Sequence, residues 1–125
     1  MPRSILIVDD SPAIRQSIRF WIESKTDWEV CGEAGNGETA LRLAELLNPD
    51  FVILDVAMPV MNGLEAADRL VTTVPKTQIV LFTNYPSDLL REHASRVGIK
   101  AVLVKDGDGT LDRLVSTIRN LPSAA

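Results

Sequence analysis

The sequence is poor in the residues that build disulfide frameworks and histidine metal sites. Its 125 residues include one cysteine, Cys31, and one histidine, His93. A single cysteine excludes an internal disulfide framework, and its position in an apolar run favours a buried, unreactive thiol. His93 lies between polar residues in a helical pattern, which favours a solvated side chain over a metal ligand.

Long hydrophobic stretches and basic clusters are also missing. The first apolar run, residues 5–8, stops at two aspartates, so the sequence predicts neither a secretory signal nor a membrane span. The net charge is −4 and no basic cluster is present, which argues against nucleic-acid binding. We therefore expect a cytoplasmic domain that contacts neither membranes nor nucleic acid.

The chain does contain enough apolar sequence for one globular core, with 46% hydrophobic and 24% charged residues. Short apolar runs, typical of strands covered on both faces, alternate with helical patterns. Five such runs predict strands at 4–8, 28–34, 51–54, 78–82 and 101–104. This alternation predicts an α/β fold of five βα units, with a parallel sheet and helices on both faces.

Polar residues follow four of these runs directly. Asp9 and Asp10 come after the first, Asp55 after the third, Thr83 after the fourth and Lys105 after the fifth. Because an open parallel sheet carries its site at the carboxyl ends of the strands, we expect these side chains to meet at one edge.

Three carboxylates in one pocket repel one another unless a cation is present. Mg²⁺ suits such a site, because it takes one or two carboxylates together with phosphate oxygens. Asp55 could then act as a nucleophile and form an aspartyl phosphate. Lys105 and the metal would neutralise the transferred charge, and the Thr83 hydroxyl could donate to a phosphoryl oxygen.

These residues resemble the receiver domains of bacterial two-component response regulators over essentially the whole chain. The most specific part is the run 54–63, with Asp55, Met58-Pro59 and Asn62-Gly63. The stretch 31–38 and Lys105-Asp106 are similar to the nitrate-regulator subclass, whose receivers usually precede a LuxR-type helix-turn-helix domain.

The resemblance assigns a role to each position of the site. It implies that Asp55 is the phosphoacceptor and that Asp10 and Asp55 ligate Mg²⁺ with the backbone carbonyl of Ala57. Asp9 would act through metal-bound water, Lys105 would contact the phosphoryl group, and Thr83 would follow it on activation.

The resemblance also implies a flavodoxin-like strand order of 2-1-3-4-5 and a sensor histidine kinase as phosphoryl donor. A homodimer through the face of the fourth helix, fifth strand and fifth helix is a further expectation, as is a role in transcription regulation. Apart from phosphotransfer to itself and slow autodephosphorylation, we expect no enzymatic activity.

One position of the site departs from the family pattern, and two others bear on the lifetime of the phosphorylated state. Val102 occupies the position where many receivers have an aromatic residue that turns inward with the threonine, so a two-residue switch of that kind is not expected. The resemblance implies that Ala57 and Tyr85 flank the approach of the hydrolytic water. Ala57 is too short to orient this water and Tyr85 is bulky enough to obstruct it, which predicts a long-lived aspartyl phosphate. The alternative is that Tyr85 points into solvent and has no part in hydrolysis.

The predicted domain covers residues 1–121, and residues 122–125 are interpreted as a tail or the start of a linker. The subclass resemblance favours a longer parent protein, although a stand-alone regulator remains an alternative.

Three other functions remain open on the residues alone. A flavin or nucleotide binder would need small residues and amides after the first strand, where this chain has Asp9-Asp10. An aspartyl phosphatase would need a second aspartate two residues after Asp55, where Ala57 stands. A receiver that acts by binding alone would not need the acidic set and Lys105.

Overall fold

The computed structural model describes residues 2–58 and 60–122 of the chain. In this part, strands and helices alternate as the sequence predicts, so the expected series of βα units is confirmed. The elements are β1 (Ser4–Val8), α1 (Pro12–Lys25), β2 (Glu29–Ala34), α2 (Gly37–Leu47), β3 (Phe51–Leu54), α3 (Gly63–Thr73), β4 (Gln78–Thr83), α4 (Asp88–Val97), β5 (Ala101–Val104) and α5 (Thr110–Asn120).

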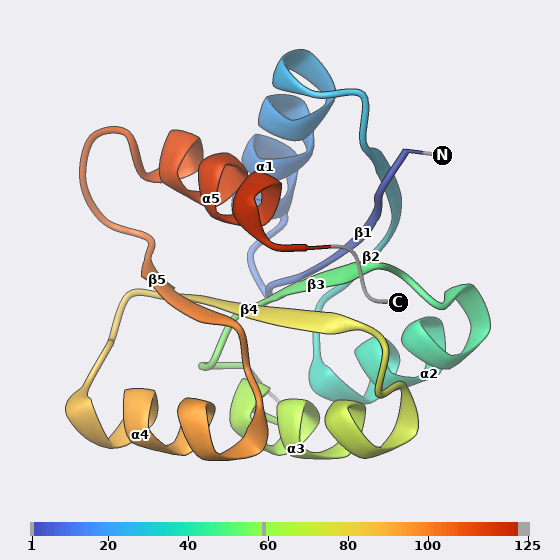
Figure 1. The fold of residues 1–125 in the computed structure, drawn as a ribbon, viewed down its shortest axis with the longest axis vertical. Coiled ribbons are helices and arrows are strands. Elements are labelled where there is room, and N and C mark those ends of the chain that lie inside the picture. The colour runs from blue at the N-terminus through green and yellow to red at the C-terminus, as the bar shows by residue number, and fades with distance from the viewer. Residues whose placement is uncertain (1, 59, 123–125) are drawn as a thin grey trace.

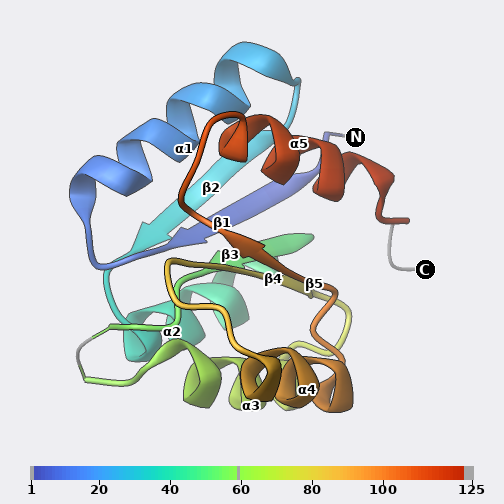
Figure 2. The same ribbon diagram turned by 90° about the vertical axis from the view of Figure 1, so that its left-hand side faces the viewer.

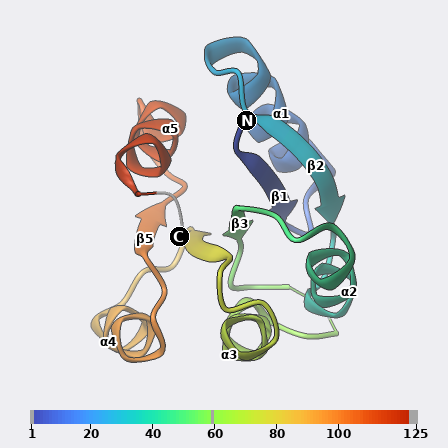
Figure 3. The same cartoon turned by 45° about the vertical axis from the view of Figure 1, so that its right-hand side comes forward.

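The strands form one parallel sheet in the order β2-β1-β3-β4-β5. Helices α1 and α5 cover one face, and α2, α3 and α4 cover the other (Figures 1 and 3). This is the predicted flavodoxin-like order with helices on both faces.

Each central strand is buried on both sides, which explains its near-continuous apolar sequence. In β1, Ile5 and Ile7 pack in the core under α1 and α5, whereas Leu6 and Val8 pack in the core on the opposite face. Successive side chains of a strand point to opposite faces, so one strand contributes to two cores. Full burial of such a side chain stabilises the fold by about 1.5–3 kcal/mol.

The strand boundaries match the predicted runs with two exceptions. β2 begins at Glu29, one residue after the predicted Trp28. β4 includes Thr83, because Thr83 pairs with Val104 and its carbonyl accepts a hydrogen bond from the Lys105 N–H at 2.9 Å. Thr83 is therefore the last residue of a strand and not the first of a loop.

Capping residues start two helices at the edge that carries the site. The Ser11 hydroxyl accepts a hydrogen bond from the Ile14 N–H, and Pro12 occupies the first turn of α1. The Asn62 side chain accepts from the Glu65 N–H at 2.9 Å and starts α3 at Gly63. These caps fix where the loops after β1 and β3 end.

The lone cysteine and the lone histidine both lie partly buried. Burial raises the pKa of the Cys31 thiol, which keeps it in the unreactive protonated form. The sequence predicted a solvated His93, but His93 on α4 contacts a neighbouring helix, since its Nε2 lies 2.9 Å from Asp68 Oδ1 on α3.

Candidate functional site

The loops that follow β1, β3 and β5 meet at the carboxyl edge of the sheet, on the left-hand side of Figure 2. Asp9, Asp55 and Lys105 lie there in direct contact. Lys105 Nζ is 2.5 Å from Asp9 Oδ2 and 3.1 Å from Asp55 Oδ1. These side chains are 3%, 6% and 8% exposed for Asp9, Asp55 and Lys105, so the ion pairs are buried.

A cavity of about 200 Å³ opens at this edge. It is lined by Asp9, Asp10, Ser11, Ile14, Asp55, Ala57, Asn84, Tyr85 and Lys105. Carboxylate oxygens of Asp9, Asp10 and Asp55 lie within 4.8 Å of one another. Three carboxylates with one lysine leave an excess of negative charge, and this donor set fits a hard divalent cation with oxygen ligands.

The surroundings of Asp55 disfavour its ionised form. Burial raises the pKa of its carboxyl group and the nearby charge of Asp9 raises it further, while the hydrogen bond from Lys105 lowers it, and the net direction is upward. A second cation beside Asp55 would favour the carboxylate.

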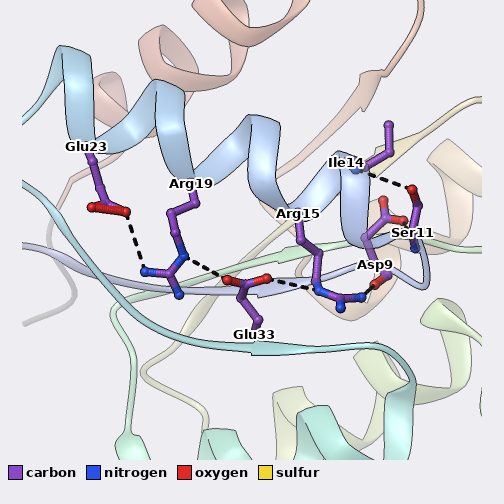
Figure 4. A network of polar contacts seen from close by, with 7 residues as sticks. All are labelled: Asp9, Ser11, Ile14, Arg15, Arg19, Glu23 and Glu33. Atoms are coloured by element: carbon purple, nitrogen blue, oxygen red, sulfur yellow. Dashed lines mark hydrogen bonds and ion pairs between the residues drawn. The ribbon is translucent and has the colours of Figure 1, made fainter.

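Three hydrogen bonds fix the turn that carries Asp9. The Ser11 N–H donates to Asp9 Oδ1 at 2.9 Å, and the Asp9 N–H donates to the Ala34 carbonyl at 3.0 Å. Arg15 on α1 donates from Nη1 to the Asp9 carbonyl at 2.6 Å (Figure 4). Sequence reasoning did not single out Arg15, because this bond becomes evident only once α1 folds back over β1.

The loop after Asp55 is fixed by the first turn of α3. The Gly63 N–H donates to the Val56 carbonyl at 2.8 Å, and a Cβ on Gly63 would lie 1.9 Å from the Asp55 carbonyl oxygen. Only glycine allows this approach. Val60 in the same loop has a φ of 68°, a strained value for a β-branched residue. Pro59, part of the sequence motif, lies outside the described residues.

Thr83 is not among the described residues that line the cavity. It is buried, and its Oγ1 accepts a hydrogen bond from the Tyr85 N–H at 3.1 Å. Asn84 and Tyr85 line the cavity at this strand end. The structure thus brings five predicted site residues to the cavity (Asp9, Asp10, Asp55, Ala57 and Lys105), whereas Thr83 is not part of the described lining.

Two further residues bear on the departures noted in the sequence. Val102 is half-buried and packs against the core that α2, α3 and α4 cover. Tyr85 is 76% exposed although it lines the cavity. Ala57 and Tyr85 both line the cavity, and their effect on the hydrolytic water stays a prediction.

A wider cavity of about 490 Å³ lies away from this chemistry, at the amino end of β3 and β4. Its polar residues hold loops in place: Asp50 accepts from the Ser4 N–H, and Thr77 donates to the Pro49 carbonyl. We therefore place the functional site at the smaller cavity. No described helix has the length and apolar character needed to cross a membrane.

The sequence matches known proteins along most of its length. The family described as response regulator receiver domain matches residues 5–119. An uncharacterised transcriptional regulatory protein of Bacillus subtilis, YxjL, is 35% identical over 116 residues, which are 92% of this chain and 52% of that protein. The nitrate/nitrite response regulator NarL of Escherichia coli K12 is 40% identical over 107 residues, or 84% of this chain and 49% of NarL. The chain spans about half the length of these relatives.

Solved structures agree with the sequence comparison. A LuxR-family DNA-binding response regulator from Staphylococcus aureus superposes with a TM-score of 0.86 at 29% identity, over 94% of this chain and 96% of that one. The response regulator domain of Thermotoga maritima CheB gives a TM-score of 0.87 at 25% identity, over 95% of both chains. The chain belongs to the family of response regulator receiver domains, the phosphorylation-dependent switches of two-component signalling.

Proposed function

We propose that Asp55 accepts a phosphoryl group from the phosphohistidine of a sensor kinase, with Mg²⁺ as cofactor. The observation that carries this proposal is the position of the Asp55 carboxylate. It lines the cavity, lies 3.1 Å from Lys105 Nζ, and has carboxylate oxygens of Asp9 and Asp10 within 4.8 Å. A carboxylate in such a site can act as a nucleophile toward phosphorus.

The Mg²⁺ ligands would be carboxylate oxygens of Asp10 and Asp55 and the backbone carbonyl of Ala57. Asp9 would act through a metal-bound water. The contacts of Asp9 support this indirect role, because its Oδ1 already accepts from the Ser11 N–H and its Oδ2 pairs with Lys105. The bound metal would supply positive charge next to the transferred group.

In the transfer step, one Asp55 oxygen forms a bond to phosphorus while the bond from phosphorus to the histidine nitrogen breaks and that nitrogen keeps the electron pair. The Lys105 ammonium lies where it can neutralise negative charge on the phosphoryl oxygens. The Thr83 hydroxyl accepts a hydrogen bond from Tyr85, so its own proton is available for a phosphoryl oxygen.

The output of the switch is proposed from the relatives. Proteins described as transcriptional regulators match this chain over about half their length, which supports a role in transcription regulation. We propose that phosphorylation changes the face formed by α4, β5 and α5 and that a homodimer forms there. Family membership also supports a cytoplasmic location. Slow autodephosphorylation would be the only other reaction.

The test is phosphorylation with acetyl phosphate and Mg²⁺, followed by mass spectrometry of the intact chain. We expect one phosphoryl mass on the parent protein and none on Asp55→Asn. Asp106→Asn is a matched control, since Asp106 is an exposed neighbour of Lys105, and it should be phosphorylated like the parent. An adduct that persists in Asp55→Asn would refute the proposal.

A further inference from the structure

Two arginines of α1 share one carboxylate of β2. Arg15 Nε donates to Glu33 Oε1 at 3.0 Å, and Arg19 Nε donates to Glu33 Oε2 at 2.7 Å. Figure 4 shows the three side chains in one row along the edge strand. Burial opposes ionisation of Glu33, but the hydrogen bonds from Arg19 and Arg15 outweigh it and lower the pKa of the carboxyl group.

The two arginines differ in what else they contact. Arg15 continues to the site, since its Nη1 donates to the Asp9 carbonyl at 2.6 Å. Arg19 leads away from the site toward Glu23, at 3.5 Å on the outside of α1. Arg15 is also the less exposed side chain, at 20% against 37%. Of the two arginines, Arg15 is therefore the one that connects Glu33 to the turn that carries Asp9 and Asp10.

We infer that Arg15, oriented by Glu33, is a positioning residue that holds the Asp9-Asp10 turn in the geometry that binds the divalent cation. This inference rests on the proposed function of the cavity. A guanidinium is planar and rigid, so the bond from Nε to Glu33 and the bond from Nη1 to Asp9 fix each other's direction. Holding the Asp9 carbonyl fixes the peptide plane between Asp9 and Asp10, and so the backbone from which both carboxylates project.

If Arg15 acted only through its charge, its removal would change the Mg²⁺ affinity in the opposite direction. Arg15 is a positive charge near a cation site, so its removal alone would strengthen Mg²⁺ binding. Removal of Arg19 would do the same more weakly. Loss of positioning weakens Mg²⁺ binding instead, and only for Arg15. The direction of the change in affinity therefore separates the two roles.

The experiment compares Arg15→Ala, Arg15→Lys and Arg19→Ala with the parent chain. Mg²⁺ affinity is measured by calorimetry, and amide hydrogen exchange is measured without metal. We expect Arg15→Ala and Arg15→Lys to bind Mg²⁺ about tenfold more weakly, the range seen when a group that orients metal ligands is lost. Lysine retains the charge but cannot make both bonds. Arg19→Ala loses a similar contact to Glu33 and should bind within about twofold of the parent.

The exchange measurement tests the same inference without metal. The Ser11 N–H, which donates to Asp9 Oδ1, should exchange faster in Arg15→Ala and at the parent rate in Arg19→Ala. Equal or tighter Mg²⁺ binding in Arg15→Ala, with unchanged Ser11 exchange, would overturn the inference. If the parent itself bound no Mg²⁺, the proposed metal site would be wrong, and Ser11 exchange would still decide whether Arg15 holds the turn.

Discussion

The two ends of the parallel sheet are built in opposite ways. At the amino end, Arg3 closes the fold by donating to the carbonyls of Ile118 and Leu121 at the end of α5, the latter at 2.7 Å. Its guanidinium also lies over the rings of Trp28 and Phe51, at 5.9 and 5.1 Å from their centroids. The positive charge thus meets the negative end of a helix and two aromatic faces.

The carboxyl end concentrates features that cost stability. Asp9 and Asp55 are buried beside a single lysine, and the raised pKa of Asp55 means that its ionisation disfavours the folded state. Val60 adds a strained backbone conformation to the loop after β3.

The difference shows how this small domain divides stability and chemistry. At the amino end, Arg3 satisfies main-chain carbonyls and the polar residues of the wider cavity hold loops in place. The carboxyl end retains two neighbouring carboxylates, whose mutual repulsion a bound divalent cation would relieve. Sites that bind and react often carry such costs, which the rest of the fold offsets. Changes at the two ends should therefore have separable effects.

The largest effect should follow from Gly63→Ala, which acts at the carboxyl end. The added Cβ would clash with the Asp55 carbonyl, so α3 must shift and the loop after β3 must move. We expect a loss of about 3 kcal/mol in the free energy of unfolding, measured by urea denaturation, together with loss of phosphorylation.

Gly98→Ala is the matched control. Gly98 ends α4 with a φ of 93°, and nothing lies within 4 Å of an added Cβ. Its cost should be about 1 kcal/mol of backbone strain, with phosphorylation retained. Equal losses in the two variants would show that the close approach at Gly63 is unimportant.

The second-largest loss of stability should follow from Arg3→Ala, which weakens the amino end alone. It removes two charged hydrogen bonds and two ring contacts, for an expected loss of about 2 kcal/mol. Phosphorylation of Asp55 should be unchanged in the folded protein. Arg119→Ala removes one ring contact at Trp28 and should cost less than about 1 kcal/mol. A slower phosphorylation of Arg3→Ala would contradict the separation of the two ends.

The next effect in size concerns the barrier to hydrolysis of the aspartyl phosphate at the carboxyl end. Ala57 and Tyr85 both line the cavity. The double variant Ala57→Asn, Tyr85→Glu adds polar groups that can orient an attacking water. Autodephosphorylation should become about tenfold faster, which corresponds to ~1.4 kcal/mol in the barrier. The loss of labelled phosphate is measured over time. A double variant no faster than the parent would show that these positions do not set the lifetime.

The smallest effect should appear in the pH dependence of stability at Glu33. Opposing its burial, the hydrogen bonds from Arg19 and Arg15 hold its pKa below the ordinary value of 4.5. Ionised Glu33 therefore stabilises the fold above pH 4.5, and this contribution is lost as the pH falls through the lowered pKa. Glu33→Gln should show a shallower fall in the free energy of unfolding below pH 4.5. An unchanged slope in urea titrations would contradict this assignment.

The fold could be predicted well from the sequence, because the fold depends on patterns within single strands and helices. Continuous apolar runs follow from burial on both faces, and the residues directly after the strands had to meet at one edge. The predicted fourth strand ended one residue too early, at residue 82, because the pairing of Thr83 with Val104 extends β4 beyond its apolar run. The contacts of Arg3 and Arg15 were not predicted, since they join elements distant in sequence through side chains of common surface types. Residues 123–125 of the expected tail lie outside the described part, and the predicted domain bounds 1–121 remain a prediction.

The most direct test of the central claim is the stability of the chain with and without a phosphoryl mimic. Urea unfolding is measured in buffer, with Mg²⁺, and with Mg²⁺ and beryllofluoride. A ligand that binds only the folded state raises the free energy of unfolding, by about 2.7 kcal/mol at a hundredfold excess over its Kd. We expect Arg3→Ala to gain as much as the parent from beryllofluoride, and Asp55→Asn to gain nothing from it. An equal gain in Asp55→Asn would contradict the claim that Asp55 carries the phosphoryl group.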